Sequence, residues 1–439
     1  MSSALLDAVP AHLRSLVSPK VGIVPLLDEC MATPDEPRLV KVSCETAEGN
    51  ELVGASLGHS GGMGGTGFSR THAVTAAIGE AVERYSGSYL PLDRLVLATA
   101  AELGRSAVAT SSFALFHYTQ YEETEFPYEP FTSSTRIHWV DGWDLATGKP
   151  AWLPAELVFL TRPTPHGSRI GYATSSGMAC AESVDAATER GLFELLERDA
   201  FMLVWSNRLS LPRLDWRSDQ SLGAIDAKYF APTGLEYAAI DLSAFHELPI
   251  VLGVVRAPGT GGALGVGAAA AAGIERAWWK ALSEAFASRS AGRTLALVRP
   301  ERSFADDGSD VLTFEDHIQF YSDDRRAEGA AFLTASTSIR GVREIPGLGE
   351  RGDERITQLV ERIIRAGSGA YAVDVTAPDV AAAGLHVVKT LAPGLCSLDV
   401  PHRARFLGSP RLLDGSKRAM LTSRSLAIED LNPLPHPFP

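Results

Sequence analysis

The sequence lacks three features that define whole classes of protein: a long apolar run, an excess of basic residues and clustered cysteines. No apolar run of about 18 residues or more occurs in the 439 residues, so we predict no membrane-spanning helix. The 40 Lys and Arg against 53 Asp and Glu leave a net charge of −13. Because a nucleic-acid binder needs a basic face, we do not predict nucleic-acid binding. The first thirty residues carry charges and do not resemble a secretory signal.

The cysteines are few and scattered, and they indicate the compartment. No CxxC spacing occurs, so neither a disulfide framework nor a zinc site is predicted, and the pattern fits reduced thiols in a cytoplasmic protein. Cys180 could be a nucleophile, although a small buried residue is the commoner role. The four cysteines are Cys30, Cys44, Cys180 and Cys396.

Strand and helix patterns alternate over most of the chain, without an internal repeat or a low-complexity block. We therefore predict an α/β (mixed α+β) fold: an N-terminal lead-in at 1–50, one large domain at 51–430 and a proline-rich tail at 431–439. The Ala- and Gly-rich stretch Ala263–Gly273 is predicted to be buried packing. Predicted strands are Leu39–Cys44, His138–Trp143, Leu235–Leu242, Pro249–Val255, Ala370–Val375 and Leu385–Leu391; predicted helices are His72–Ser86, Asp185–Trp205, Glu275–Ser288 and Ile356–Ile364.

A glycine-rich stretch, Gly58–Gly67 (GHSGGMGGTG), precedes the first long helix. It matches both GxSxG and GxGxxG, but about ten residues separate Ser60 from the helix, and no acidic residue follows on a second strand. The GK[ST] of a phosphate-binding Walker loop is absent. Two interpretations remain: a flexible surface loop, or a loop whose backbone N–H groups, such as those of Gly62 and Gly64, bind phosphate.

Two segments repeat one charged helical pattern, ExxER. Because residues at i, i+3 and i+4 share one face of a helix, each segment places two Glu and one Arg on a single stripe. A solvated stripe of Glu–Arg pairs is the simplest interpretation. The apolar residues that surround the second stripe instead favour enclosure, and enclosed glutamates in excess of arginines favour Mg²⁺. The residues are Glu80, Glu83 and Arg84 in the first segment, and Glu194, Glu197 and Arg198 in the second; Lys280, Glu284 and Arg289 mark a third helix of similar character.

These segments together resemble the YcaO family, in particular its azoline-forming peptide cyclodehydratases of thiazole/oxazole-modified natural-product biosynthesis. The resemblance covers nearly the whole chain, and the ExxER segments in this order with the proline-rich end make it specific. The blocks are LVSPKVGIV (Leu16–Val24), AIGEAVERYS (Ala77–Ser86), ATSSGMACAESVDAATERGLFELLERDAF (Ala173–Phe201), ALSEAFASR (Ala281–Arg289), LHVVKTLAPGL (Leu385–Leu395), HRARFLGSPRL (His402–Leu412) and the final NPLPHPFP.

The resemblance implies ATP and Mg²⁺ as cofactors and assigns roles to individual residues. It implies Glu80, Glu83, Glu194 and Glu197 as Mg²⁺ ligands, and Gly62, Gly64, Ser176, Arg84, Arg198, Glu284 and Arg289 as nucleotide-binding residues. The family reaction joins a Cys, Ser or Thr side chain of a precursor peptide to the preceding amide carbonyl, and phosphorylation of the resulting oxyanion allows ring closure. The carboxylate of Pro439 is the implied catalytic base.

The resemblance also implies partners. A ribosomally made precursor peptide is the substrate, and a protein related to ubiquitin-activating enzymes is expected to bind its leader. A flavin-dependent azoline dehydrogenase and a second copy of the chain, as a homodimer, complete the expected partners; nucleic acid and membrane are not among them.

Six positions differ from the usual family pattern, and two other functions stay open. One is thioamide or amidine formation by the same amide activation, and the other is a catalytically silent scaffolding subunit. The differing positions are Met63 for Lys, Ser176 for Asn, Ala181-Glu182 for Gly-Asn, Ala186 for Glu and Ala287 for Gln.

Overall fold

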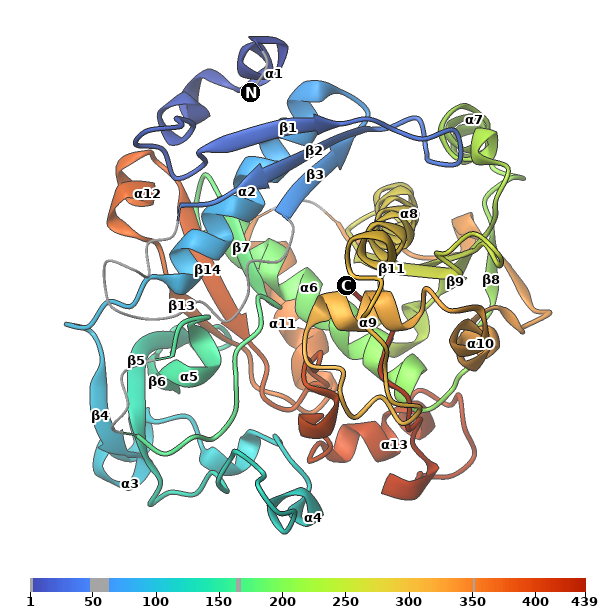
Figure 1. The fold of residues 1–439 in the computed structure, drawn as a ribbon. Coiled ribbons are helices and arrows are strands. Elements are labelled where there is room, and N and C mark those ends of the chain that lie inside the picture. Colours follow the sequence, from blue (N-terminus) through green and yellow to red (C-terminus); the bar gives the residue numbers. More distant parts are fainter. Residues whose placement is uncertain (1–2, 48–62, 163–166, 350–351) are drawn as a thin grey trace. The chain divides into compact units, whose positions relative to one another are not determined.

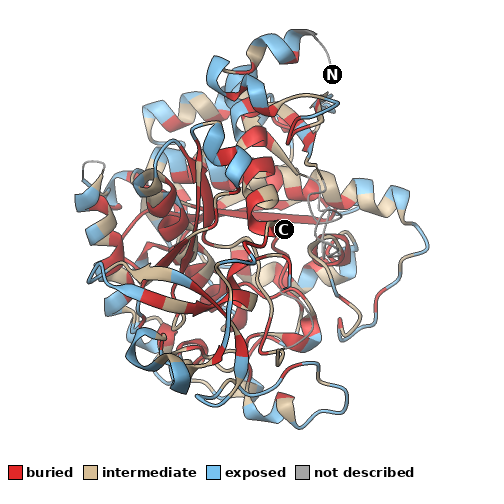
Figure 2. Cartoon of the chain, turned by 90° about the vertical axis from the view of Figure 1, so that its left-hand side faces the viewer, coloured by how far each residue is buried: buried red, intermediate tan, exposed pale blue. Residues whose placement is uncertain are grey.

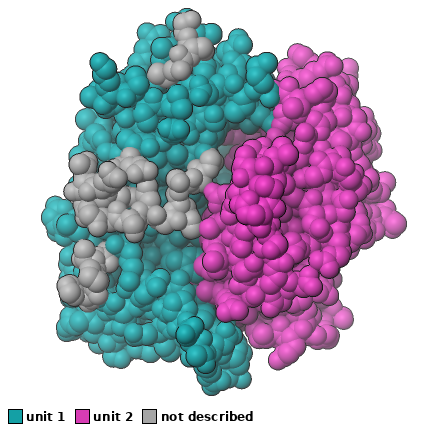
Figure 3. Space-filling view, in the orientation of Figure 1, with its two compact units in different colours: residues 1–31, 39–195, 350–395 teal, residues 32–38, 196–349, 396–439 magenta. Residues whose placement is uncertain are grey.

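The structure is a computed structural model, and it describes residues 3–47, 63–162, 167–349 and 352–439 (Figure 1). The chain divides into two compact units, each assembled from three separate segments (Figure 3). Unit 1 contains residues 1–31, 39–195 and 350–395, and unit 2 contains residues 32–38, 196–349 and 396–439. Within both units the strands are largely buried, whereas many helices have one buried and one exposed face (Figure 2).

Unit 1 contains two sheets. A three-stranded antiparallel sheet has the order β1-β2-β3, and a six-stranded sheet has the order β4-β5-β13-β14-β7, with β6 paired to β5. The strands are β1 (Leu26–Cys30), β2 (Val40–Glu45), β3 (Met63–Gly67), β4 (Val96–Thr99), β5 (Arg136–Asp144), β6 (Pro150–Pro154), β7 (Met178–Ala181), β13 (Tyr371–Asp374) and β14 (His386–Leu391). The helices are α1 (Ser3–Ala8), α2 (Arg70–Ser88), α3 (Ala100–Leu103), α4 (Tyr118–Tyr121), α5 (Ala155–Val158), α11 (Asp353–Arg365), α12 (Pro378–Ala382) and the first part of α6 (Val184–Ser206).

Unit 2 is built on one five-stranded sheet of order β11-β10-β9-β8-β12, antiparallel except for the parallel pair β8 and β12. The strands are β8 (Arg213–Asp215), β9 (Glu236–Asp241), β10 (Ile250–Arg256), β11 (Leu264–Ala270) and β12 (Ile339–Gly341). The helices are the second part of α6, α7 (Gln220–Tyr229), α8 (Ile274–Val298), α9 (Phe314–Phe320), α10 (Asp324–Ala327) and α13 (Pro410–Arg418).

The six predicted strands and four predicted helices are confirmed as elements of their type. The strands are β2, β5, β9, β10, β13 and β14, and the helices are α2, α6, α8 and α11. α8 continues ten residues beyond the predicted Ser288, to Val298. The predicted buried packing of Ala263–Gly273 is also confirmed for its central residues, which form strand β11. The boundaries proposed at residues 50 and 430 stay predictions.

The interpretation of the glycine-rich stretch as a surface loop is wrong for its described residues. Met63–Gly67 form β3, paired along its whole length with β2, while residues 58–62, including Gly62, lie outside the described residues. A Cβ on Gly65 would clash with the carbonyl of Ala73 and lie 2.5 Å from the amide nitrogen of Ala77. These glycines therefore let α2 cross the strand at very short range, which a motif scan cannot distinguish from loop flexibility.

Glycines also allow a helix to pack very close to a strand in unit 2. A Cβ on Gly253 of β10 would lie 2.5 Å from the carbonyl oxygen of Ala281 in α8, and one on Gly265 of β11 would clash with the carbonyl of Ala285. α8 is thereby seated closely on the sheet, with Trp278 and Phe286 buried. In both units a glycine-containing strand fixes the depth of a helix that carries predicted site residues.

Candidate functional site

Helix α2 presents the first ExxER stripe in unit 1. Its N-cap is Ser69, whose side chain accepts a hydrogen bond from the N–H of His72 at 3.2 Å, and small apolar residues bury the opposite face. On the charged stripe, Glu80 lies 3.6 Å from Arg84, one turn later. The other oxygen of Glu80 accepts the backbone N–H of Gly64 at 3.0 Å. In this conformation the Gly64 N–H, predicted to bind phosphate, is therefore engaged by a predicted metal ligand.

Glu83 is the buried member of this stripe. Its Oε1 accepts the backbone N–H of Cys180 at 2.8 Å, at the centre of β7. Burial raises its pKa, the hydrogen bond from Cys180 and the charge of Arg84 oppose this, and the charges of Glu194 and Glu80 add to it; the resulting pKa is about 8. Three of the four predicted metal ligands therefore converge within unit 1. Their mutual repulsion is what a divalent cation would relieve.

Lys389 adds a buried cation to this cluster. It lies on β14 with 4% of its surface exposed, and its Nζ donates to the carbonyl oxygens of Thr174 and Ser176, each at 2.6 Å. Burial lowers its pKa to about 8, although the charge of Glu194 opposes that change. Ser176, predicted to bind nucleotide, is thus held through its backbone by a residue whose role the sequence analysis missed. The available signal was a single lysine inside the apolar strand LHVVKTL.

The fourth predicted metal ligand, Glu197, lies in unit 2. It is 3% exposed, and its Oε2 accepts the backbone N–H of Ala270 at the end of β11, at 2.9 Å. Arg198 lies beside it, with 3.5 Å between Nε and the second carboxylate oxygen. The guanidinium of Arg198 also lies 4.1 Å above the ring of Phe438. The second ExxER stripe is therefore in contact with the proline-rich tail within this unit.

Glu284 and Arg289, the predicted residues of the third helix, have different surroundings on α8. Glu284 is part-exposed and lies 3.5 Å from Lys280, four residues earlier. Arg289 is 1% exposed, and its Nη2 bonds Oδ2 of Asp35 at 2.8 Å. The Thr33 hydroxyl, followed by the guanidinium groups of Arg289 and Arg293, holds the pKa of Asp35 well below its usual range. Arg289 thus anchors residues 32–38 in unit 2.

The residue that follows the second ExxER stripe anchors the helix. Asp199 is fully buried, and its two oxygens accept hydrogen bonds from Arg411 Nε at 2.6 Å and from His246 Nε2 at 2.8 Å. The backbone N–H of Cys396 is a further donor, at 2.9 Å. Such a satisfied buried carboxylate fixes the rotation of α6, and therefore the direction in which Glu197 and Arg198 project.

The tail at 431–439 forms no helix or strand, as predicted, and most of it is buried in unit 2. Phe438 is 1% exposed and packs on Phe201, with 4.7 Å between ring centroids. Pro439 is part-exposed at its end. The tail thus reaches the level of Glu197 and Arg198 on α6 in this unit.

The residues present in unit 1 fit Mg²⁺ by their donor chemistry. Carboxylate oxygens are the hard ligands that Mg²⁺ prefers, and Glu80 and Glu194 are close enough to Glu83 for their charges to raise its pKa. Arg84 and Lys389 place positive charge next to them, as a polyphosphate would require. In the described part of the chain, no helix has the length and apolar character needed to cross a membrane.

These features define a class of protein: a mixed helix–sheet fold whose acidic helices pack closely on glycine-containing strands. Comparison with known proteins gives its family. A family profile described as YcaO cyclodehydratase, ATP- and Mg²⁺-binding, matches residues 64–396. The chain belongs to the YcaO family, whose cofactors are ATP and Mg²⁺. None of the curated proteins compared with the chain matches it.

Solved structures share the fold. A heterocyclase in complex with substrate and cofactor is 24% identical, with a TM-score of 0.79 over 99% of this chain and 57% of its own. The heterocyclase TruD is 25% identical, with a TM-score of 0.65 over 84% of this chain and 52% of its own. YcaO from Methanopyrus kandleri, bound with AMPPCP and Mg²⁺, is 17% identical, with a TM-score of 0.60 over 87% and 88%. The chain thus spans little more than half the length of the two heterocyclases.

Proposed function

We propose that the protein is an ATP-dependent cyclodehydratase that closes azoline rings in a ribosomally made precursor peptide. The observation that carries this proposal is the grouping of Glu80 and Glu194 around the buried Glu83 in unit 1, where burial first, and then the charges of Glu194 and Glu80, raise the pKa of Glu83 to about 8. A protein without a bound cation gains nothing from such a cluster, whereas a Mg²⁺–polyphosphate site requires it. Membership of the YcaO family and the two heterocyclase neighbours support the same function.

Each predicted site residue has a role in this proposal that follows from its position. Bound MgATP would supply the phosphoryl group that turns the peptide amide oxygen into a leaving group. Glu80, Glu83, Glu194 and Glu197 would hold the metal through their oxygens, and Arg84 and Arg198 would neutralise phosphate charge. Lys389 holds the backbone at 174–176 so that Ser176 is presented in one position. Gly62, Gly64, Glu284 and Arg289 stay proposals as nucleotide-binding residues.

The tail is proposed to take part in the reaction. Phe438 connects it to Arg198, and the Pro439 carboxylate would accept the proton of the attacking thiol or hydroxyl. A short Gly-Ser extension after Pro439 should then abolish cyclisation while it leaves thermal stability unchanged. If the extended protein cyclises its peptide at the wild-type rate, the carboxylate is not the base.

Substitution of the glutamates by Gln, which preserves size, tests the proposed function. Glu83→Gln, Glu194→Gln and Glu197→Gln should each remove ATP-dependent loss of water from the peptide, measured by mass spectrometry, and weaken Mg²⁺ binding in calorimetry. Glu361→Gln is the matched control, because Glu361 is exposed on α11. Full activity of all three site variants would refute the metal-ligand set.

The product and the turnover of ATP separate the other functions. Thioamide formation would exchange oxygen for sulfur and so change the product mass, an amidine would leave the Cys, Ser or Thr side chain unmodified in fragment spectra, and a scaffolding subunit would turn over no ATP. A partner related to ubiquitin-activating enzymes is proposed to supply leader binding. Large stimulation by that partner is expected, and tight leader binding by this protein alone, measured by fluorescence polarisation, would contradict it. An azoline dehydrogenase and a homodimer are further proposed partners.

A further inference from the structure

Side chains of unit 2 hold the tail through its backbone carbonyl groups. Proline has no backbone N–H, so a proline-rich segment forms backbone hydrogen bonds mainly through its carbonyl oxygens. His317 accounts for one of these contacts and differs from the other donors because both of its ring nitrogens are engaged. The other donors are Arg405 Nη1 to Asn432 O (2.7 Å), His402 Nε2 to Pro433 O (2.8 Å), Trp205 Nε1 to Leu434 O (3.1 Å) and Tyr321 OH to Pro435 O (2.5 Å).

His317 lies between two carbonyl oxygens, one of the tail and one of the unit's body. Its Nδ1 is 2.7 Å from His436 O, and its Nε2 is 2.7 Å from Val400 O. The ring is fully buried, so water cannot replace either contact. A neutral imidazole carries one N–H and one lone pair, and a carbonyl oxygen only accepts. Both contacts are therefore hydrogen bonds only when the ring carries two protons.

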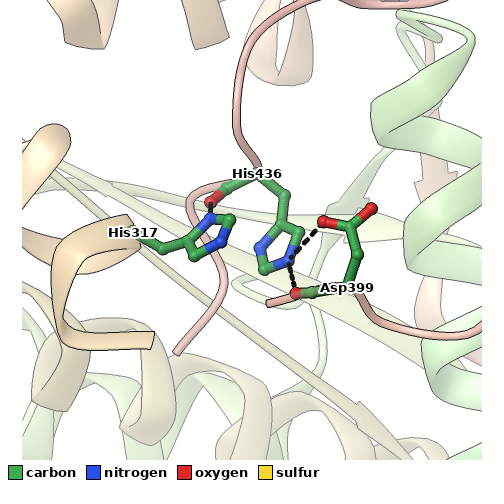
Figure 4. Close-up of side chains that lie close together, drawn as sticks. All are labelled: His317, Asp399 and His436. Carbon is green, nitrogen blue, oxygen red and sulfur yellow. Dashed lines mark hydrogen bonds and ion pairs between the residues drawn. The ribbon is translucent and has the colours of Figure 1, made fainter. Parts of the chain in front are cut away.

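The neighbouring His436 is satisfied as a neutral ring. Its Nε2 lies 2.7 Å from the carbonyl oxygen of Asp399 and 3.4 Å from Oδ1 of the same residue (Figure 4). Its Nδ1 accepts the backbone N–H of Phe438 at 3.2 Å. One N–H and one lone pair therefore satisfy His436. A positive charge in this pair of rings belongs on His317.

His317, Asp399 and His436 could be taken for a metal site, but the ring geometry opposes it. The two imidazoles are stacked, with centroids 4.0 Å apart and planes 14° apart. A metal ion lies close to the plane of each imidazole that binds it, and one ion cannot lie in two nearly parallel planes separated in this way. Both nitrogens of His317 are also already directed at carbonyl oxygens, Nδ1 at that of His436 (Figure 4) and Nε2 at that of Val400.

We propose that His317 is the positioning residue of the tail: as an imidazolium it donates to both His436 O and Val400 O, and so joins the tail to the body of unit 2. This fixes the register of the tail, and with it the place of Phe438 beside Arg198. The inference deepens the proposed function, and only its activity measurement rests on that function.

Burial and the neighbouring charges set the pH range of this contact. Burial lowers the pKa of His317 below its usual value, and the carbonyls of Val400 and His436 and the charge of Asp316 oppose this only in part. Burial raises the pKa of Asp399 to about 7, and Arg405 opposes this. The imidazolium contact is therefore present at pH values below the pKa of His317 and is lost as pH rises through it. The remaining titratable or charged neighbours are His402, whose pKa burial lowers to about 3, and Tyr321 and Arg198.

The protonation state can be read directly by NMR with ¹⁵N-labelled histidine in the full-length protein. We expect one histidine with both nitrogens in the imidazolium range at pH 5, and its loss in His317→Gln assigns it. Because burial lowers its pKa, this histidine should lose its second proton at a lower pH than a histidine in a peptide. A singly protonated His317 at pH 5 in the wild-type protein would overturn the inference.

Two substitutions separate hydrogen bonding from packing. His317→Gln retains two N–H groups without charge, whereas His317→Phe retains an aromatic ring without donors. Hydrogen exchange of the tail amides, measured by mass spectrometry, should be protected in the wild type and largely in the Gln variant, and at least tenfold faster in the Phe variant. Equal protection in all three proteins would refute a positioning role. If the imidazolium and the protection are found but no protein cyclises peptide, the proposed function fails while this inference stands.

Discussion

Replacing Glu83 with Gln should stabilise the metal-free protein at neutral and higher pH while it removes the response to Mg²⁺. Burial and the charges of Glu194 and Glu80 raise the pKa of Glu83 from 4.5 to about 8. In the unfolded chain this group ionises near its ordinary pKa, so between about pH 4.5 and 8 the folded protein binds one proton more than the unfolded chain. Stability therefore falls as pH rises through this interval.

The size of the effect follows from the shift. At about 1.4 kcal/mol per pH unit, the full shift corresponds to ~5 kcal/mol, and the part reached at pH 7 is about 3 kcal/mol. Glutamine does not titrate, and its amide oxygen can still accept the N–H of Cys180. We expect Glu83→Gln to show a much flatter dependence of unfolding free energy on pH than the wild type.

Urea unfolding in the presence of a chelator, from pH 5 to 8, measures this difference, with Glu361→Gln as the control for an exposed glutamate. Adding Mg²⁺ with a non-hydrolysable ATP analogue should then raise the stability of the wild type and of the control, but not that of Glu83→Gln. Parallel pH profiles of wild type and Glu83→Gln, or equal stabilisation by the metal, would refute the assignment of Glu83 as a crowded metal ligand.

Three further substitutions test the architecture around the site. Lys389→Met leaves the carbonyls of Thr174 and Ser176 without their donor and should cost about 2 kcal/mol of unfolding free energy, whereas Lys417→Met on the exposed face of α13 should cost almost nothing; equal effects in urea unfolding would contradict the role of Lys389. Gly65→Ala should lower the thermal midpoint strongly because its Cβ would meet α2, whereas Gly79→Ala, with open space around its Cβ, should be neutral or stabilise by up to ~1 kcal/mol. Phe438→Ala removes the ring contacts with Arg198 and Phe201, and it should speed hydrogen exchange of the tail and lower cyclisation together; faster exchange with unchanged cyclisation would show that the tail is only structural.

Periodicity was sufficient to predict the elements that carry the site. α2 and α6 have long apolar faces interrupted by a charged stripe, so their type and the shared face of Glu80 and Glu83 follow from 3.6-residue spacing. β3 and β11 were missed as strands because glycine and alanine carry little strand propensity. What decides their conformation is the close approach of α2 and α8, a tertiary constraint that no local window contains.

The partners of individual side chains were beyond the sequence for a related reason. Lys389 lies more than 200 residues from Thr174 and Ser176, and nothing near it in the sequence indicates its acceptors. His317 likewise meets the tail at His436, more than 100 residues away. The resemblance to a family identifies charged motifs in the sequence. These buried donors belong to no such motif, because each is a single polar residue in apolar surroundings, so the sequence did not predict their roles.

The strand order of the larger sheet in unit 1 has a consequence for synthesis of the protein. β13 and β14 lie between β5 and β7 in the sheet, yet about 190 residues separate the end of β7 from the start of β13. At a translation rate of roughly 5–20 residues per second, the earlier strands wait about 10–40 s for their central neighbours. During that time β5 and β7 have unpaired edges that can join other chains. The nascent protein should therefore depend on chaperones, and lowering the expression temperature, which slows such edge-to-edge association, should increase the yield of folded protein.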